Sequence, residues 1–507
     1  MDKTRGMKTR PNILLILSDD HGQWAMGCSG NKEVHTPNLD ALAASGLRFE
    51  NFFCTSPVCS PARASILTGR IPSQHGILDW LRRGESTREW SKGKEEGKTI
   101  EYLAGQRGYA DLLAAQGYRC GISGKWHMGD ADHAQKGFSF WRVNVSGTQY
   151  QNPVFTDGRE FSQEKGYLSD IITDYALDFI ERQKNADEPF YLSVHHNAPH
   201  APWLRDLHPQ VTFDDYMANC PFRSTPNVPM HAWMPDTPEK TGRVYPEKTY
   251  PRDETERRER VSGYYTAITE MDRNIGRLVE TLDRNGLREK TLVIYLSDNG
   301  MNLGHHGIYG KGNGTFPMNM YDTSVKVPLI INRPGHAPGG QVVTEMFSQY
   351  DLMPTLLDYV GVNNPGADRL PGRSFAPMLR GEACEGRPGV VVFDEYGPVR
   401  MVRTREWKYV HRYPYGPHEL YDLRNDPEEI HNLISSVGMD SRAAELKAML
   451  EDWFRRYADP ERDGVYEPVT GEGQIGLIGP RSAGRPAFEK TSLVKIRGAG
   501  MAEQKYP

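Results

Sequence analysis

Two pairs of oxygen-bearing side chains each follow directly on an apolar run of strand length. Asp19 and Asp20 come after NILLIL, and Asp298 and Asn299 come after TLVIYLS. In an open parallel sheet, ligands bind beyond the carboxyl ends of the strands, so the two pairs are expected to meet there. Either pair alone is equally typical of a helix N-cap or a turn, but two pairs at equivalent strand ends favour a metal site. Three carboxylates and an amide oxygen suit Ca²⁺, or alternatively Mg²⁺, better than Zn²⁺, which prefers His and Cys.

A cysteine stands at the start of a third segment with chemical potential, CSPARASILTGR. Pro61 fits the first position of a helix and Gly69 fits its end, which places Cys59 at or just before a helix N-terminus. Backbone N–H groups and the helix dipole favour an anion at that place. A lone cysteine there is ordinarily a buried structural residue or a thiol of low pKa, so the neighbouring residues must decide its role.

These neighbours resemble the signature of the sulfatase family, in which the cysteine of a Cys-x-Pro-x-Arg segment is converted to formylglycine. The segments Gly-Lys-Trp-His at 124–127, Ala-Pro-His at 198–200 and Gly-Lys-Gly at 310–312 resemble further family segments, and the resemblance covers most of residues 11–435. It implies a cation site made of Asp19, Asp20, residue 59, Asp298 and Asn299.

The resemblance also implies a set of catalytic side chains: Cys59, Arg63, Lys125, His127, His200 and Lys311. By the same resemblance, one hydroxyl of hydrated formylglycine at position 59 would be held by the cation and attack the sulfur atom, and the second hydroxyl would allow sulfate to be expelled. Asp298 is expected to accept the proton of the nucleophile. His200, alone or with Lys311, is the expected general acid and His127 the expected base, although these two assignments are interchangeable. The cationic side chains stabilise charge in the transition state.

Two further groups of residues near the motifs have open roles. The first group flanks the metal motifs and offers candidate pocket histidines: His21, His305 and His306. The second group either stacks on a sugar or aromatic ring of the substrate or packs in the core: Trp126, Trp141, Tyr150 and Trp203.

The elements that must position these residues alternate along the chain. FYLSVHH at 190–196 and VPLIIN at 327–332 add to the two strands above, and a helical pattern of apolar residues runs from about Glu256 to Asn285. This alternation predicts an α/β fold with a large mixed, mostly parallel sheet sandwiched by helices. The resemblance makes that fold alkaline-phosphatase-like.

The pattern changes past about residue 375. Short extended pieces joined by tight turns precede one amphipathic helix at 441–459, which predicts a smaller C-terminal subdomain with an antiparallel sheet. We therefore expect a catalytic domain at 1–375 and a subdomain at 376–507. The stretch from about 461 is rich in Gly, Pro and charge, so it is either a tail wrapped on the surface or partly disordered.

Composition excludes several partner classes. A net charge of -5, from 61 basic and 66 acidic residues, leaves no basic stripe for nucleic acid and no polybasic arm for a membrane. No window approaches the roughly 20 apolar residues of a membrane span. The six cysteines are too few and too irregularly spaced for a disulfide framework, and the first apolar segment reads as a strand rather than a signal peptide. A cytoplasmic location and a small-molecule substrate are expected.

The function predicted from this sequence is hydrolysis of sulfate monoesters, of a small sulfated sugar or an aryl alcohol, after a formylglycine-generating enzyme has modified Cys59. One alternative is a phosphonate monoester or phosphodiester hydrolase with the same site. The other is a catalytically silent binding homologue in which Cys59 is never modified.

Overall fold

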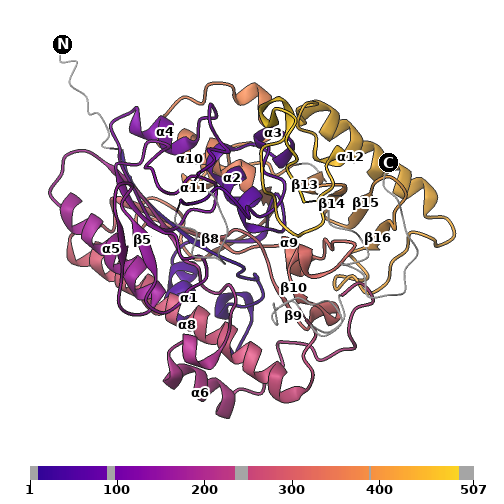
Figure 1. Ribbon diagram of the computed structural model, residues 1–507, viewed down its shortest axis with the longest axis horizontal. Coiled ribbons are helices and arrows are strands. Elements are labelled where there is room, and N and C mark those ends of the chain that lie inside the picture. The colour runs from indigo at the N-terminus through magenta and orange to yellow at the C-terminus, as the bar shows by residue number, and fades with distance from the viewer. Residues whose placement is uncertain (1–9, 88–97, 235–248, 388–389, 490–507) are drawn as a thin grey trace.

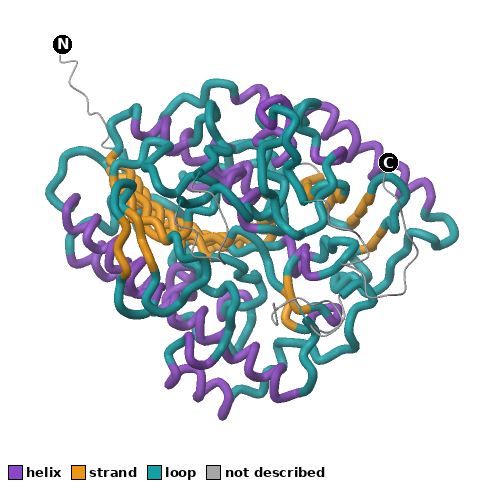
Figure 2. The backbone as a smooth tube through the Cα atoms, in the orientation of Figure 1, coloured by secondary structure: helices purple, strands orange, loops and turns teal. Residues whose placement is uncertain are grey.

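The computed structural model describes residues 10–87, 98–234, 249–387 and 390–489. Its largest element is a ten-stranded sheet that crosses the molecule (Figures 1 and 2). The strands in order are β12 (Gln341–Ser348), β2 (Leu47–Phe53), β11 (Leu329–Asn332), β8 (Thr291–Ser297), β1 (Asn12–Ser18), β7 (Phe190–His195), β3 (Arg119–Lys125), β4 (Phe140–Asn144), β5 (Val154–Thr156) and β6 (Phe161–Gln163).

The centre of this sheet is parallel and its flanks are mixed. Strand β1 pairs in parallel with both β7 and β8, and β3 pairs in parallel with β7 and β4. Strand β11 runs antiparallel to β8 and β2, and β5 runs antiparallel to β4. The predicted mixed, mostly parallel sheet is therefore confirmed.

Helices cover both faces of the sheet (Figure 1). One face carries α1 (Pro37–Ala44), α5 (Leu168–Gln183) and α8 (Glu254–Arg284); the other carries α2 (Cys59–Thr68), α4 (Tyr109–Ala114) and α10 (Leu352–Tyr359). Side chains alternate along β1 with a period of two, so Ile13 and Leu15 enter one core while Leu14 and Ile16 enter the other. Burying each of them stabilises the fold by roughly 1.5–3 kcal/mol.

Helix α8 spans 31 residues and agrees with the predicted helix to within two residues at each end. Its N-cap is Asp253, whose side chain accepts a hydrogen bond from the Glu256 N–H. The shorter helices and strands are α3 (Pro72–His75), α6 (Gln210–Asn219), α9 (Asp322–Val325), α11 (Ala376–Leu379), β9 (Asn302–Leu303) and β10 (Tyr309–Gly310). Among the helices of the described ranges, none combines the length and apolar character that crossing a bilayer requires.

The predicted C-terminal antiparallel sheet and helix are present. Strands β13 (Val390–Tyr396), β14 (Val399–Thr404), β15 (Trp407–Arg412) and β16 (Glu419–Asp422) pair in sequence order, and α12 (Asp440–Tyr457) packs on them. The division at residue 375 stays a prediction, and the outer ends of both expected domains, 1–9 and 490–507, lie outside the described residues.

A buried ion cluster joins this C-terminal unit to α9, which lies between strands β8 and β11 of the large sheet in the chain. Lys408 of β15 is fully buried and contacts Asp322 Oδ1 at 2.6 Å, and it also pairs with Glu429. Arg403 of β14 contacts Asp322 Oδ2 at 2.9 Å. Burial alone would raise the pKa of Asp322, but Arg403 and Lys408 hold it well below its usual range. The aspartate is therefore ionised, and it couples the two units by charge.

Candidate active site

The carboxyl ends of β1 and β8 bring the two oxygen-bearing pairs together. Ser18 and Ser297 are register partners, so the residues that follow them are neighbours. The Asp20 N–H donates to Asp298 Oδ1 at 3.1 Å, and the Asn299 Nδ2 donates to Asp20 Oδ1 at 2.8 Å. All four side chains, including Asp19, are buried. The juxtaposition expected from the strand ends is therefore present.

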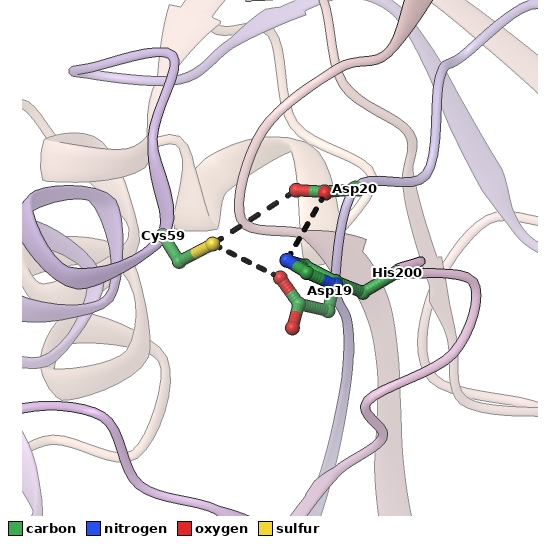
Figure 3. Close-up of side chains that lie close together, drawn as sticks. All are labelled: Asp19, Asp20, Cys59 and His200. Carbon is green, nitrogen blue, oxygen red and sulfur yellow. Dashed lines mark hydrogen bonds and ion pairs between the residues drawn. The ribbon is translucent and has the colours of Figure 1, made fainter. Parts of the chain in front are cut away.

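Cys59 opens α2 and points its thiol into this cluster (Figure 3). The Sγ lies 3.2 Å from Asp19 Oδ1, and Lys311 Nζ donates to it at 2.8 Å. The helix starts at Cys59 itself, two residues before the Pro61 start that the sequence suggested, because Val58 is extended and takes the N-cap position. Gly69 ends the helix with a φ of +66°, as expected.

The thiol in this place is a poor nucleophile. Burial raises the pKa of Cys59 far above its ordinary value, and the Asp19 carboxylate raises it further. A protonated, buried thiol between a carboxylate and an ammonium group neither attacks an ester nor resembles the low-pKa cysteines of thiol enzymes. The position is therefore chemically useful only if residue 59 carries a different nucleophile.

Three buried cations face the three carboxylates. Arg63, one turn along α2, contacts Asp298 Oδ2 at 2.8 Å, and Lys125, at the end of β3, contacts Asp19 Oδ2 at 2.5 Å. Lys311 pairs with Asp20. Burial would lower the pKa of Lys125 and Lys311, but their carboxylate partners raise it above the ordinary value, so both stay charged.

The pKa values of two of these carboxylates, Asp19 and Asp298, are shifted in opposite directions. Burial would raise the pKa of Asp19, but Lys125, His200, Arg63 and Lys311 together hold it well below its usual range. For Asp298, burial and the nearby Asp19 raise the pKa to about 7 despite the contact with Arg63. Within one cluster, Asp19 is thus a permanent anion and Asp298 is able to exchange a proton near neutral pH.

The donor set fits a hard divalent cation. Asp19, Asp20 and Cys59, joined by His200, place one potential ligand atom each within 4.8 Å of one another. The Asn299 Oδ1 is buried and has no hydrogen-bond partner among the described residues. An orphaned amide oxygen beside clustered carboxylates is what an oxygen-binding cation would satisfy. Asp298 is not one of these four residues, and its Oδ2 accepts a hydrogen bond from Arg63 Nε at 2.9 Å.

His200 lies beside Asp19 and Asp20 in the cluster (Figure 3). Its Nε2 is 3.6 Å from Asp20 Oδ2, and its side chain is 25% exposed. The Nδ1 is 2.6 Å from the Ala201 carbonyl, which leaves Nε2 directed toward the site. Tyr150 holds the backbone of this segment by donating to the His200 carbonyl at 2.5 Å. Sequence reasoning placed His200 among the catalytic residues but not among the potential ligands.

His127 borders the site with one ring nitrogen engaged. Its Nε2 is 3.2 Å from the Leu81 carbonyl and 3.9 Å from Glu85 Oε1. Its Nδ1 is buried and has no hydrogen-bond partner in the described part of the chain. Burial, with Lys125 next in effect, lowers the pKa of His127 well below its ordinary value, so the ring is neutral.

Several residues that hold the site were missed by the sequence analysis. His195 Nδ1 is 2.8 Å from the Lys125 carbonyl, and Gln349 Nε2 donates to the Asp298 carbonyl at 2.6 Å. Tyr264 donates to the Asp20 carbonyl at 2.9 Å. Each acts on a backbone oxygen, and no motif records such a contact. The only available signal was that His195 closes the strand that leads to His200.

The candidate pocket histidines have other partners. His21 bonds Tyr295 and the Ala25 carbonyl, and His305 packs against Trp24 with ring centroids 4.5 Å apart. His306 stacks on Tyr321 at 3.7 Å. Their rings are thus used in packing beside the metal motifs.

The four aromatic residues near the motifs are buried in the protein core and are not available to stack on a sugar. Trp126 and Trp141 are 1% and 3% exposed, and their ring centroids lie 5.0 Å apart. Tyr150 is fully buried, and Trp203 is 4% exposed with its Nε1 donating to the Pro199 carbonyl. Of the two readings left open by the sequence, stacking on the substrate is therefore wrong for these four residues.

Two family models and several curated proteins match this chain over most of its length. A family model described as Sulfatase matches residues 11–362, and one described as N-sulphoglucosamine sulphohydrolase, C-terminal, matches residues 304–456. An N-acetylglucosamine-6-O-sulfatase of Bacteroides thetaiotaomicron is 28% identical, over 90% of this chain and 88% of that protein. A choline-sulfatase of Rhizobium meliloti is 30% identical, over 91% of each chain.

Solved structures share the fold. A protein in complex with its substrate D-glucosamine-2-N,6-O-disulfate superposes with a TM-score of 0.73 at 25% identity, over 90% of this chain and 99% of that one. A phosphonate monoester hydrolase of Agrobacterium radiobacter superposes with a TM-score of 0.63 at 21% identity, over 87% of this chain and 95% of that one. The second likeness concerns the fold alone.

Proposed function

Because this chain belongs to the sulfatase family of enzymes, within the alkaline phosphatase superfamily, we propose that it hydrolyses sulfate monoesters of a small sulfated sugar, with a modified residue 59 as nucleophile. The observation that carries the proposal is the place of Cys59. Its Sγ lies at a helix N-terminus between the Asp19 carboxylate and the Lys311 ammonium group, where an unmodified thiol is held protonated.

The proposed cofactors are formylglycine at position 59, made by a maturation enzyme, and Ca²⁺, with Mg²⁺ as the alternative. The hydrate of formylglycine would supply a hydroxyl nucleophile and a second hydroxyl for sulfate release, and the cation would lower the pKa of the first. Asp19, Asp20, Asp298 and Asn299 would hold the cation. Their buried oxygens, and the unsatisfied Asn299 amide oxygen, support this choice.

The cationic side chains have a common task. Lys125 and Lys311 are charged and buried at the nucleophile, so they would stabilise the negative charge on the sulfate oxygens without having to move. Arg63 is held by Asp298 and by the Lys125 carbonyl, and it would keep the start of α2 and residue 59 in place. Its contact with Asp298 favours this supporting role over contact with the leaving group.

Proton transfer would be divided between three residues. Asp298, whose pKa is raised to about 7, would accept the proton of the nucleophile. His200 directs Nε2 toward the cluster and is partly exposed, which suits protonation of a leaving alcohol. His127 is neutral and keeps an unpartnered Nδ1, within the described residues, which suits a base.

The substrate half of the proposal rests on relatives. One relative is named for N-acetylglucosamine 6-O-sulfate, another for choline sulfate, and a solved neighbour holds a glucosamine disulfate. A sulfate monoester carries one negative charge, whereas a phosphate monoester carries about two near neutral pH. A site that acts on sulfate monoesters is therefore expected to prefer them to the matching phosphate monoesters, the opposite preference to that of an alkaline phosphatase.

The test compares matched esters with protein produced together with a formylglycine-generating enzyme. We expect sulfate monoesters to be turned over faster than the matching phosphate diester or phosphonate by at least about a hundredfold. Mass spectrometry of the peptide containing residue 59 is expected to find the aldehyde in place of the thiol. A faster phosphonate would establish the alternative activity, and an intact thiol in protein from its native host would establish the silent homologue.

Removing the cation is expected to abolish turnover. Chelation should stop the reaction, and Ca²⁺ or Mg²⁺ should restore it while Zn²⁺ alone should not, because the donor set is oxygen-rich. Binding should also raise the melting temperature, since a ligand of the folded state stabilises it. Asp20→Asn should lose this rise, whereas Asp214→Asn, at a side chain 52% exposed, should keep it. Recovery with Zn²⁺ alone would count against the assignment.

A further inference from the structure

A segment after α12 returns to the active site. Residues 463–489, here called the C-terminal strap, lie beyond both regions matched by family models. The strap runs in yellow past α3 in Figure 1. Val469, Ile478 and Phe488 are buried in the same core as Leu78 and Leu81 of the segment that follows α3. Of the two readings of this stretch, a tail wrapped on the protein therefore holds for residues 463–489.

One strap residue holds the chain that follows α3. Gln474 is fully buried, its N–H donates to the Trp80 carbonyl at 2.8 Å, and its carbonyl accepts from the Arg82 N–H at 2.9 Å. Its side-chain Oε1 accepts from the Leu78 N–H at 2.8 Å, and its Nε2 donates to the Gly76 carbonyl at 3.0 Å. Residues 76–82, here called the 76–82 loop, are thus held by two main-chain and two side-chain hydrogen bonds of Gln474, and the main-chain pair flanks Leu81.

Leu81 connects this loop to two sides of the site. Its N–H donates to Ser60 Oγ at 3.0 Å, next to residue 59. Its carbonyl faces His127 Nε2 at 3.2 Å. A carbonyl accepts but never donates, so the contact requires the proton of the neutral His127 ring to sit on Nε2. The Nδ1 lone pair is thereby left free to act as a base.

The strap also touches the loop that carries Lys311. The Gly471 carbonyl accepts from Trp80 Nε1 at 3.1 Å and from Asn313 Nδ2 at 3.4 Å. Gly471 has a φ of +81°, and a Cβ there would lie 2.8 Å from the Asn313 Cβ, so the strap backbone approaches this loop as closely as only glycine allows.

We propose that the C-terminal strap is a positioning element of the active site, in which Gln474 holds the Leu81 carbonyl and so keeps the His127 proton on Nε2. The role of His127 in this inference rests on the proposed function. The placement of the loop, the carbonyl and the ring does not, because neither the modification of residue 59 nor the cation takes part in these contacts.

The first measurement needs no variant of the strap. In wild-type protein labelled with ¹⁵N-histidine, with the signal assigned by comparison with His127→Gln, we expect His127 to be neutral and protonated on Nε2. A ring protonated on Nδ1 would overturn the proposal at once, whatever the enzymatic activity of the sample.

The second measurement uses Gln474→Ala, with Glu489→Ala as the matched control on the same strap. Glu489 forms ion pairs with Arg82 and Arg83, in which every partner is more than 40% exposed. Hydrogen exchange in the peptide 76–85 is expected to accelerate by at least about tenfold in Gln474→Ala and to stay unchanged in Glu489→Ala. The pKa of His127, followed through exchange of its imidazole C2 proton, should rise as the ring is released toward water.

The kinetic arm separates positioning from stability. Gln474→Ala should lower kcat by about tenfold or more while KM stays within about twofold, because a misaligned base slows the chemistry more than binding. Unchanged exchange in peptide 76–85, or an unchanged His127 tautomer and pKa together with a lowered kcat, would overturn the proposal. If turnover is absent in the wild type, the exchange and tautomer results still decide the structural claim while the proposed function fails separately.

Discussion

Replacing Cys59 by alanine is expected to remove turnover of sulfate esters while the fold survives. Alanine is well accepted inside a helix, and the hydrogen bonds of the thiol within the described residues are those with Asp19, Asp20 and Lys311. Losing the nucleophile itself should lower kcat by about 10⁴-fold or more. Steady-state kinetics with an aryl sulfate, together with thermal unfolding, measures both halves of this expectation.

Cys120→Ala is the matched control, since it also removes a buried thiol. Cys120 lies in β3, where its Sγ contacts the Ala110 carbonyl at 3.7 Å, away from the cluster of charges. Its activity should stay close to that of the wild type. Substantial turnover by Cys59→Ala would refute the nucleophile assignment.

Cys59→Ser refines the same test. A serine hydroxyl can accept sulfate from the substrate but lacks a second hydroxyl on the same carbon, so release of sulfate should fail. Intact-protein mass spectrometry after incubation with substrate is expected to find one added sulfo group. A serine variant that turns over repeatedly would mean that the second hydroxyl is not needed.

Replacing His200 by alanine is expected to slow a sugar sulfate by about a hundredfold or more while hardly affecting a nitrophenyl sulfate. A general acid contributes most when the leaving alkoxide is most basic. His200 suits that role because its Nδ1 is engaged with the Ala201 carbonyl and its Nε2 faces the cluster from the exposed side. The measurement is kcat/KM for both substrates with the same enzyme preparation.

The two substrates control for damage to the pocket. A disturbed cation site or a lost sulfate contact would depress both rates alike, because both esters carry the same sulfate. Equal losses would therefore transfer the acid role to Lys311 or His127. Loss of turnover with the sugar sulfate alone, without any change in melting temperature, would place the acid at His200.

Local sequence was sufficient to locate most of the groups of the candidate site. An apolar run followed by Asp-Asp or Asp-Asn predicts a strand end with ligand oxygens, and the observed registry of β1 and β8 puts those ends side by side. The end of α2 at Gly69 was predicted equally well, because the residue that closes the helix adopts a positive φ, which glycine tolerates. The prediction that Cys59 lies at a helix N-terminus is confirmed, and only Pro61 differs, as the third helical residue and not the first, because proline is tolerated throughout the first turn.

The tertiary structure alone decided which group pairs with which. Arg63 could have faced residue 59 or the substrate, and it binds Asp298; the raised pKa of Asp298 follows from burial and from Asp19, which no linear pattern encodes. Trp126 and Trp203 could have faced a ligand, and they are buried in the core. Such outcomes depend on which surfaces meet after the chain has folded.

The residues that hold the site residues in place could not be predicted from the sequence. Gln474, His195 and Gln349 act on backbone groups of Leu78, Lys125 and Asp298, from positions between 51 and 396 residues away along the chain. A backbone oxygen looks the same in every residue, so a contact with it leaves no trace in residue types. The sequence by itself therefore determined the chemistry that residues 19, 59 and 298 are able to perform, whereas only the folded chain determined what holds them, because that depends on long-range contacts between groups that all residues share.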